Sequence, residues 1–232
     1  MDYLRKADER GRANFGWLDS RHSFSFGSYF DPRHMGFSVL RVINDDQVRG
    51  GMGFGAHGHR DMEIVSYVLE GAIEHRDSLG NRFLLPAGEV QRMSAGTGIQ
   101  HSEFNASQTD SLRFLQIWIE PAVTGIEPGY EQANIPQQGA LTPLVTPDGR
   151  HGSLRIHQDA SLYRLRLAAG EAAALGTGER QGYLHVIDGH ASTDAVTLAP
   201  GDGLGMKAQR EREITAGPGG FEALWFDLPG DH

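Results

Sequence analysis

The chain has 232 residues, of which 39% are hydrophobic and 22% charged, a balance typical of a folded globular protein and not of a disordered one. It contains no cysteine, which excludes a disulfide framework, a thiolate metal site and a cysteine nucleophile. The formal net charge is −9 and no dense run of Lys or Arg is present, so we expect no nucleic-acid partner.

The amino-terminal segment, residues 1–12, is polar and charged, with no apolar signal-peptide core behind it. No stretch of the chain approaches the roughly 18 apolar residues that a membrane span requires. The sequence therefore predicts a cytoplasmic protein with no membrane partner.

Short apolar runs separated by turn signals follow one another along the chain. In chain order they lie at residues 37–43, 63–69, 72–76, 83–85, 112–119, 153–157, 162–167, 183–187, 195–198 and 221–228. No window sustains a helical period, and the Ala-rich segment 168–174 is the one place where a helix is weighed as an alternative. Together with 31 glycines, this pattern predicts an all-β protein with many turns.

The two halves of the chain share a pattern of strand and turn. Val68-Leu69-Glu70-Gly71 resembles Val186-Ile187-Asp188-Gly189, and Leu85-Pro86-Ala87-Gly88 resembles Leu198-Ala199-Pro200-Gly201. Two copies of one small barrel explain this best, and chance similarity among β-turns is the alternative. A proline-rich connector over residues 121–152 separates them. We expect domains at residues 1–132 and 133–232.

Two short motifs in the first half carry metal-binding chemistry. On an extended strand, residues two apart point to one face, so His57 and His59 share a face, as do His101 and Glu103. If the two strands face each other across a barrel interior, three imidazoles and one carboxylate meet at a mononuclear site for a divalent metal. Burying these four groups without partners would cost roughly several kcal/mol of folding free energy, and coordination of a metal ion removes that cost. If both motifs face solvent, the argument does not apply.

Other readings of the same region compete with this one. Asp61 and Glu63 share the parity of His57 and His59, so either is a rival for the carboxylate position. The glycine-rich segment 51–55 has the look of a phosphate-binding loop, but no Lys follows it and no helical pattern begins there.

The motifs together resemble the cupin superfamily. Gly51, His57-Gly58-His59, Glu63 and Gly71 are similar to the first cupin motif, and Gly80, Pro86-Ala87-Gly88, His101 and Asn105 to the second, with about a dozen extra residues before the histidine. This departure resembles the pirin family of two-barrel cupins. Further pirin-like stretches are His22-Ser23-Phe24-Ser25-Phe26, Tyr29-Phe30-Asp31-Pro32, residues 36–45, residues 75–80 and residues 93–103.

The resemblance implies an all-β bicupin of two tandem jelly-roll barrels, with metal only in the amino-terminal one. The implied metal ligands are His57, His59, His101 and Glu103. The resemblance also implies that Glu63 is not a ligand. The second half has no H-x-H motif. The spacing is six residues between His151 and His157 and five between His185 and His190. We interpret these four histidines as surface or capping residues of a metal-free barrel.

The resemblance also implies a function: a metal-dependent quercetin 2,3-dioxygenase-like oxidoreductase with a flavonol-like substrate and O2. Glu103 would accept the 3-hydroxyl proton as a catalytic base, and cleavage of the heterocycle would release carbon monoxide. Fe(II) is the expected ion, with Cu, Ni, Co, Mn and Zn as alternatives. The alternative functions are a non-catalytic, iron-dependent regulatory binding module and another cupin chemistry, such as an isomerase or a hydrolase.

Overall fold

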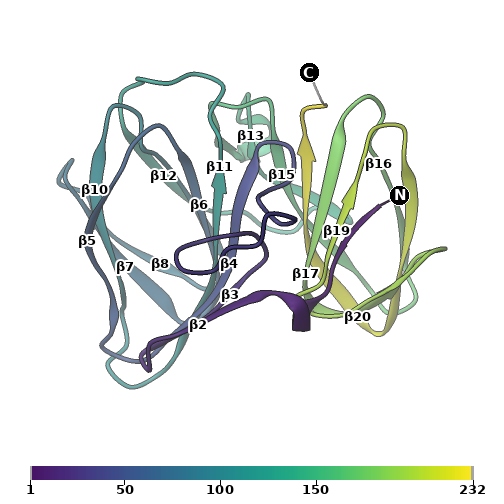
Figure 1. Ribbon diagram of the computed structural model, residues 1–232, viewed down its shortest axis with the longest axis horizontal. Coiled ribbons are helices and arrows are strands. Elements are labelled where there is room, and N and C mark those ends of the chain that lie inside the picture. Colours follow the sequence, from purple (N-terminus) through teal and green to yellow (C-terminus); the bar gives the residue numbers. More distant parts are fainter. Residues whose placement is uncertain (1, 231–232) are drawn as a thin grey trace. The chain divides into compact units, whose positions relative to one another are not determined.

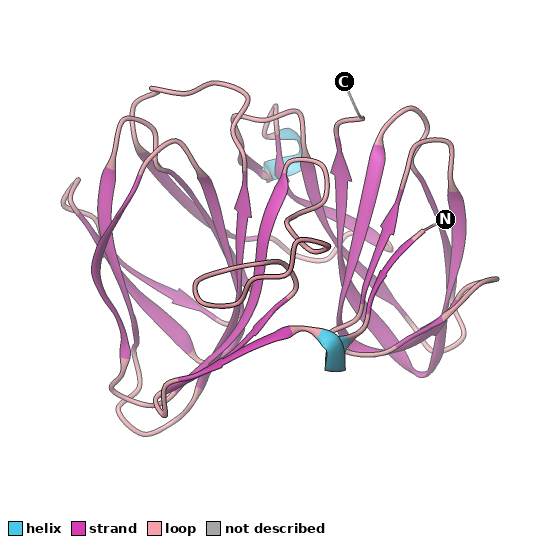
Figure 2. Ribbon diagram, in the orientation of Figure 1, coloured by secondary structure: helices cyan, strands magenta, loops and turns pink. Residues whose placement is uncertain are grey.

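The computed structural model describes residues 2–230, which form two compact units. The amino-terminal domain comprises residues 11–135 and 154–158, and the carboxy-terminal domain comprises residues 2–10, 136–153 and 159–230. Both are built almost wholly from strands (Figures 1 and 2). The predicted all-β, two-barrel architecture is confirmed. Over residues 2–230, no helix is long and apolar enough to cross a membrane.

The amino-terminal domain consists of two antiparallel sheets. One sheet has the order β5-β10-β7-β8 and the other the order β12-β9-β6-β11-β4-β3-β2. The strands are β2 (Gly11–Asn14), β3 (Leu18–His22), β4 (Leu40–Val48), β5 (Gly53–His59), β6 (Glu63–Glu70), β7 (Ala72–Asp77), β8 (Arg82–Pro86), β9 (Glu89–Ser94), β10 (Ile99–Asn105), β11 (Leu112–Ile119) and β12 (Gly129–Asn134). The two-residue strand β14 (Leu154–Arg155) also falls in this domain but in neither of these sheets.

The core of this domain lies between its two sheets. Ile73 and Leu85 from the four-stranded sheet pack with Val68, Leu112 and Phe114 from the seven-stranded sheet. A second cluster joins Ile99 of β10 to Ile64, Met93 and Ala95. Alternate residues of each strand therefore face the space between the sheets, as expected for a sandwich closed into a barrel.

The strands of the carboxy-terminal domain belong to one sheet with the path β1-β19-β17-β20-β15-β13, in which β16 pairs with β20 and β18 with β17. Its elements are β1 (Tyr3–Arg5), η1 (Ala7–Glu9), β13 (Leu141–Thr146), η2 (Arg150–Gly152), β15 (Ser161–Leu167), β16 (Ala172–Gly176), β17 (Gln181–Ser192), β18 (Thr197–Leu198), β19 (Gly203–Met206) and β20 (Glu211–Leu228).

The repeat seen in the sequence is visible in the backbone. Gly71 and Gly189 both have a φ of +75°, and Gly88 and Gly201 have φ values of +85° and +84°. These are left-handed conformations that glycine adopts without steric cost. A Cβ at Gly189 would lie 2.2 Å from the carbonyl oxygen of Gly220, so the close approach of two strands also requires glycine there.

The structure adds local detail that the sequence did not indicate. The Ala-rich segment 168–174 contains no helix: Ala172–Gly176 is β16, which pairs with β20 and is stabilised by that long-range contact. The proposed connector contains β12, a largely polar segment that pairs with β9, and β13, which pairs with β15. The division predicted between residues 132 and 133 falls inside β12, whose last pair joins Asn134 to Glu89 of the amino-terminal sheet.

Candidate metal centre

Three imidazole rings converge in the amino-terminal domain, with His57 exposed, His59 half-buried and His101 buried. The Nε2 atom of His101 lies 3.0 Å from Nε2 of His59 and 3.1 Å from Nε2 of His57. Antiparallel pairing places them together, because His101 of β10 is directly opposite His57 of β5, and Ile99 is opposite His59. The two strands are therefore neighbours in one sheet, and the expectation that they face each other across the barrel is wrong.

The three rings turn their Nε2 atoms toward one another. Burial, helped by the adjacent imidazoles, lowers the pKa of His59 to about 4 and that of His101 to about 3. Nδ1 of His57 donates a 2.8 Å hydrogen bond to the carbonyl oxygen of Gly55, which leaves Nε2 as the nitrogen that faces the other two rings. Three imidazoles with converging Nε2 atoms fit a divalent transition metal, so the donor set suits the ion that the sequence predicts.

Glu103 lies beside this triad on the floor of the barrel. It is 3% exposed, and a register shift in β10 separates it from His101. Its Oε2 accepts a 2.8 Å hydrogen bond from Nε2 of Gln116, while Oε1 accepts bonds from Ser66 at 3.2 Å and Gln91 at 3.3 Å. Burial raises the pKa of Glu103, although nearby histidines and these hydrogen bonds oppose the shift.

The four predicted site residues fall into two overlapping groups. Donor atoms of His57, His59 and His101 lie within 4.8 Å of one another, and so do donor atoms of His101, Glu103 and His75. His101 belongs to both groups, and the carboxylate of Glu103 is grouped with His75.

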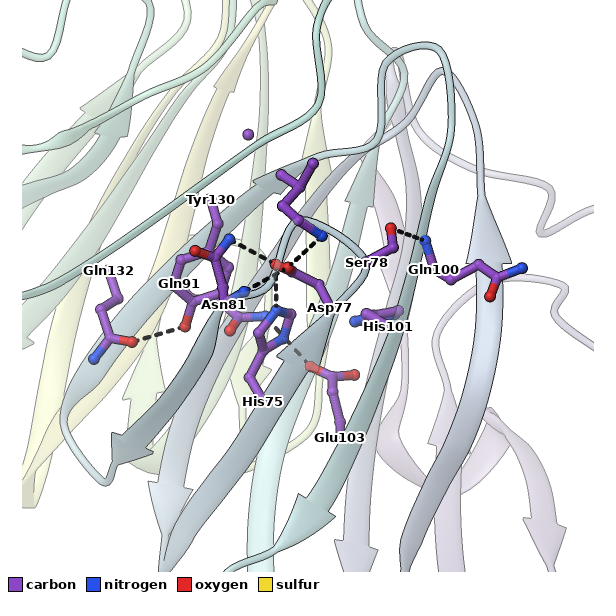
Figure 3. A network of polar contacts seen from close by, with 12 residues as sticks. His75, Asp77, Ser78, Asn81, Gln91, Gln100, His101, Glu103, Tyr130 and Gln132 are labelled. Atoms are coloured by element: carbon purple, nitrogen blue, oxygen red, sulfur yellow. Dashed lines mark hydrogen bonds and ion pairs between the residues drawn. The ribbon is translucent and has the colours of Figure 1, made fainter.

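His75 and Asp77 of β7 are residues that sequence reasoning missed. His75 is directly opposite Glu103, and its Nε2 lies 3.0 Å from Oδ2 of Asp77 (Figure 3). Both side chains are fully buried. The available signal was the H-x-D spacing, which places the two residues on one face of a strand, as H-x-E does for His101 and Glu103.

Aromatic and apolar side chains line the barrel interior next to the histidines. Trp118 meets the ring of His59 edge-on with 5.0 Å between centroids, and Phe26 meets Trp118 at 5.3 Å. On the other side, Tyr130 lies 4.5 Å from the ring of His75. Trp118 and Tyr130 also pack on the apolar cluster around Ile64 and Met93.

Asp61 and Glu63, the rivals for the carboxylate ligand, belong to neither of these two groups of possible metal donors, which we call the metal-type groups. Glu63 is buried, but its carboxylate accepts a 3.0 Å hydrogen bond from Ser94 and lies 3.3 Å from Nδ1 of His157. Asp61 sits in a turn with a φ of +46° and accepts a hydrogen bond from the backbone of Gly125. Residue parity continues to Glu63 only if the chain stays extended, and the turn at Asp61 breaks that continuity.

The remaining histidines were interpreted as surface or capping residues of the second barrel. This is wrong for His185, which is 1% exposed in β17, and His157 belongs to the amino-terminal domain. His151 and His190 are exposed. Neither of the two metal-type groups found over residues 2–230 includes a residue of the carboxy-terminal domain.

Comparisons with known proteins agree with this architecture. The Pirin family profile matches residues 4–119, and the profile of the quercetinase C-terminal cupin domain matches residues 143–228. The quercetin 2,3-dioxygenase of Escherichia coli strain K12 is 50% identical over 230 residues, covering 99% of both chains. A pirin-like protein of Caulobacter vibrioides is 41% identical over 214 residues, which cover 90% of this chain and 92% of that one.

Solved structures show the same similarity. The bacterial pirin YhhW from Escherichia coli, in complex with nickel(II), has a TM-score of 0.95 at 50% identity and covers 100% of both chains. A quercetin 2,3-dioxygenase from Acinetobacter baumannii shares the fold, with a TM-score of 0.78 at 17% identity over 99% of this chain and 86% of that one. The resemblance predicted from sequence motifs is confirmed: the chain belongs to the pirin family.

Proposed function

We propose that this protein is a metal-dependent dioxygenase that cleaves the heterocyclic ring of flavonols such as quercetin with O2, with the loss of carbon monoxide. The observation that carries the proposal is the convergence of three imidazoles beside a buried carboxylate, with Nε2 of His101 3.0 and 3.1 Å from the Nε2 atoms of His59 and His57. The quercetin 2,3-dioxygenase of Escherichia coli strain K12, 50% identical over 99% of this chain, supports the choice of reaction.

The proposed ligands of one divalent ion are His57, His59, His101 and Glu103. When bound, the ion supplies Lewis acidity toward the flavonol oxygens and the reactivity toward O2 that protein side chains lack. Three nitrogens and one oxygen accept several divalent ions, including the nickel(II) that binds the similar YhhW. We propose Fe(II) as the native ion, on the family resemblance.

Glu103 is the proposed proton acceptor for the 3-hydroxyl of the flavonol. Burial raises the pKa of Glu103, which makes its carboxylate a better base than an exposed glutamate. The hydrogen bonds from Gln116, Ser66 and Gln91 restrict its position. A base held in place before the substrate arrives does not have to be oriented during the reaction.

The apolar wall fits the flat aromatic rings of a flavonol. Trp118, Phe26 and Tyr130 offer ring faces and edges next to the histidines, and Met93 offers a polarisable side chain behind them. Such a lining excludes water, which strengthens electrostatic interactions at the reacting atoms.

The test combines metal content with turnover. We expect His57→Ala and His101→Ala to lose most of the bound metal and the oxygen uptake with quercetin, because each removes one of three converging nitrogens. His190→Ala is the matched control, since His190 is exposed in the carboxy-terminal domain, and it should keep both. Equal metal content in all three variants would contradict the ligand assignment.

The same assay separates the dioxygenase from its main alternative. Iron-loaded protein that consumes no O2 and releases no carbon monoxide with any flavonol would refute the proposed reaction. A metal-dependent binding module without turnover would give that result while its metal content still depended on His57 and His101.

A further inference from the structure

His75 is a buried polar side chain that the proposed reaction does not use. It is 0% exposed, although it lies in the middle of the barrel interior opposite Glu103. Its Nδ1 atom is buried and has no hydrogen-bond partner among the described residues. A buried ring nitrogen without a partner costs free energy, so its persistence here calls for a ligand or a partner that meets it.

Asp77 determines which nitrogen of His75 carries the proton. Its Oδ1 accepts hydrogen bonds from the backbone of Leu79 and Asn81, and its Oδ2 accepts one from the Asn81 side chain. Its Oδ2 also lies 3.0 Å from Nε2 of His75 and, as a carboxylate oxygen, accepts the N–H of that nitrogen. Nδ1 is therefore the ring nitrogen that remains available to a ligand.

His75 belongs to a group of residues whose donor atoms could hold a metal ion. A donor atom of His75 lies within 4.8 Å of donor atoms of His101 and Glu103, and all three side chains are buried. Figure 3 shows the His75 ring between Asp77 on one side and Glu103 on the other. A histidine whose second nitrogen donates to a carboxylate is the usual arrangement of a metal-ligating imidazole, because the carboxylate fixes the tautomer and raises ligand basicity.

We propose that the barrel holds a second, inner position for a divalent metal ion, with His75 Nδ1, His101 and Glu103 as its protein ligands. Because His101 and Glu103 serve both positions, the inner position and the His57–His59–His101 position are alternatives for one ion. The two carboxylates of Glu103 and Asp77 balance the charge of a dication at the inner position. A buried ion is tolerated only with such compensation. The proposal depends on donor geometry and not on the proposed reaction.

The experiment removes the outer position and asks whether an ion still binds. In the His57→Ala/His59→Ala variant, titration with Co2+ should give one saturable site per chain, seen in the visible absorption spectrum and as a rise in Tm. Adding His75→Ala should abolish this binding. Adding Asp77→Asn should weaken it roughly 10- to 100-fold, the usual effect of losing the partner of a ligating histidine.

The matched control is His157→Ala in the same background. His157 also places Nδ1 next to a buried carboxylate, that of Glu63, but belongs to neither metal-type group, so its loss should leave Co2+ affinity unchanged. Folding of every variant is verified by circular dichroism.

A crystallographic measurement keeps the proposal testable if His75→Ala does not fold. Anomalous maps of Co2+-soaked His57→Ala/His59→Ala crystals should show a peak about 2.1 Å from His75 Nδ1. The absence of saturable Co2+ binding by the folded double variant, unchanged affinity after His75→Ala, or a peak away from His75 would each overturn the inner position. Quercetin turnover is not a readout here, so these results are separate from the test of the dioxygenase.

Discussion

Replacing Gln116 with methionine should move the pH dependence of flavonol turnover. The Gln116 side chain donates a 2.8 Å hydrogen bond to Oε2 of Glu103, and the acceptor is wholly enclosed. Hydrogen bonds to charged groups are worth about 1.5–3 kcal/mol. Methionine keeps the length and approximate volume of the side chain but removes the donor. The ionised form of Glu103 then loses that stabilisation, so the pKa of its carboxyl rises further.

The consequence is specific to one limb of the pH profile. On the acid limb, kcat/KM is proportional to the fraction of Glu103 that is ionised. Loss of about 1.5–3 kcal/mol, at 1.36 kcal/mol per factor of ten, should therefore lower kcat/KM there roughly 10- to 150-fold. The limb should shift to higher pH, and the rates should converge with those of the parent chain on the plateau.

The assay is oxygen uptake with quercetin across the pH range, with metal content measured in parallel. Gln47→Met is the matched control, because Gln47 is exposed on β4, and its profile should not move. An equal loss at every pH would indicate a merely structural defect. An acid limb that stays in place would refute the role of Glu103 as the proton acceptor.

Two further predictions concern the buried carboxyl groups. Burial raises the pKa of Glu103, so above the ordinary pKa of a glutamate its carboxyl costs folding free energy that a neutral amide would not. Glu103→Gln should therefore raise the Tm of the metal-free chain at pH 7 while abolishing most turnover, and a lower Tm would contradict this. Burial also raises the pKa of Asp46 to about 7, against an opposing hydrogen bond from Ser20. The stability that the protonated Asp46 contributes is complete below its unfolded pKa of about 4 and is lost as pH rises through about 7. Thermal melts of the metal-free chain should show this decline, and Asp46→Asn should flatten it; parallel curves would count against the assignment.

The fold class could be read from the sequence because its determinants are local. Alternating apolar runs, turn glycines and the matched Gly71 and Gly189 follow from backbone geometry at single positions. The helix weighed at residues 168–174 does not form: alanine has the highest helix propensity, but intrinsic propensity is a weak determinant, and the pairing of β16 with β20 overrides it. Local preference loses wherever a distant strand supplies more hydrogen bonds and burial.

The candidate ligands could also be named from the sequence. Residues two apart on a strand share a face whatever the surrounding fold, so His57 with His59 and His101 with Glu103 were predicted as pairs. The spacing alone did not reveal which strands would be neighbours. The pairing of His101 with His57 depends on the register of β10 against β5, and that register follows from the packing of the whole sheet.

The surroundings of the ligands were decided only by the tertiary structure. Gln116, Ser66 and Gln91 come from three different strands, and each looks like an ordinary polar residue in an apolar run until the strands are side by side. His75 and Asp77 acquire meaning only once β7 lies next to β10. Sequence therefore determined which face each side chain takes, a property of a few consecutive dihedral angles. Only the folded barrel decided which faces meet, because that choice is made by contacts between residues far apart in the chain.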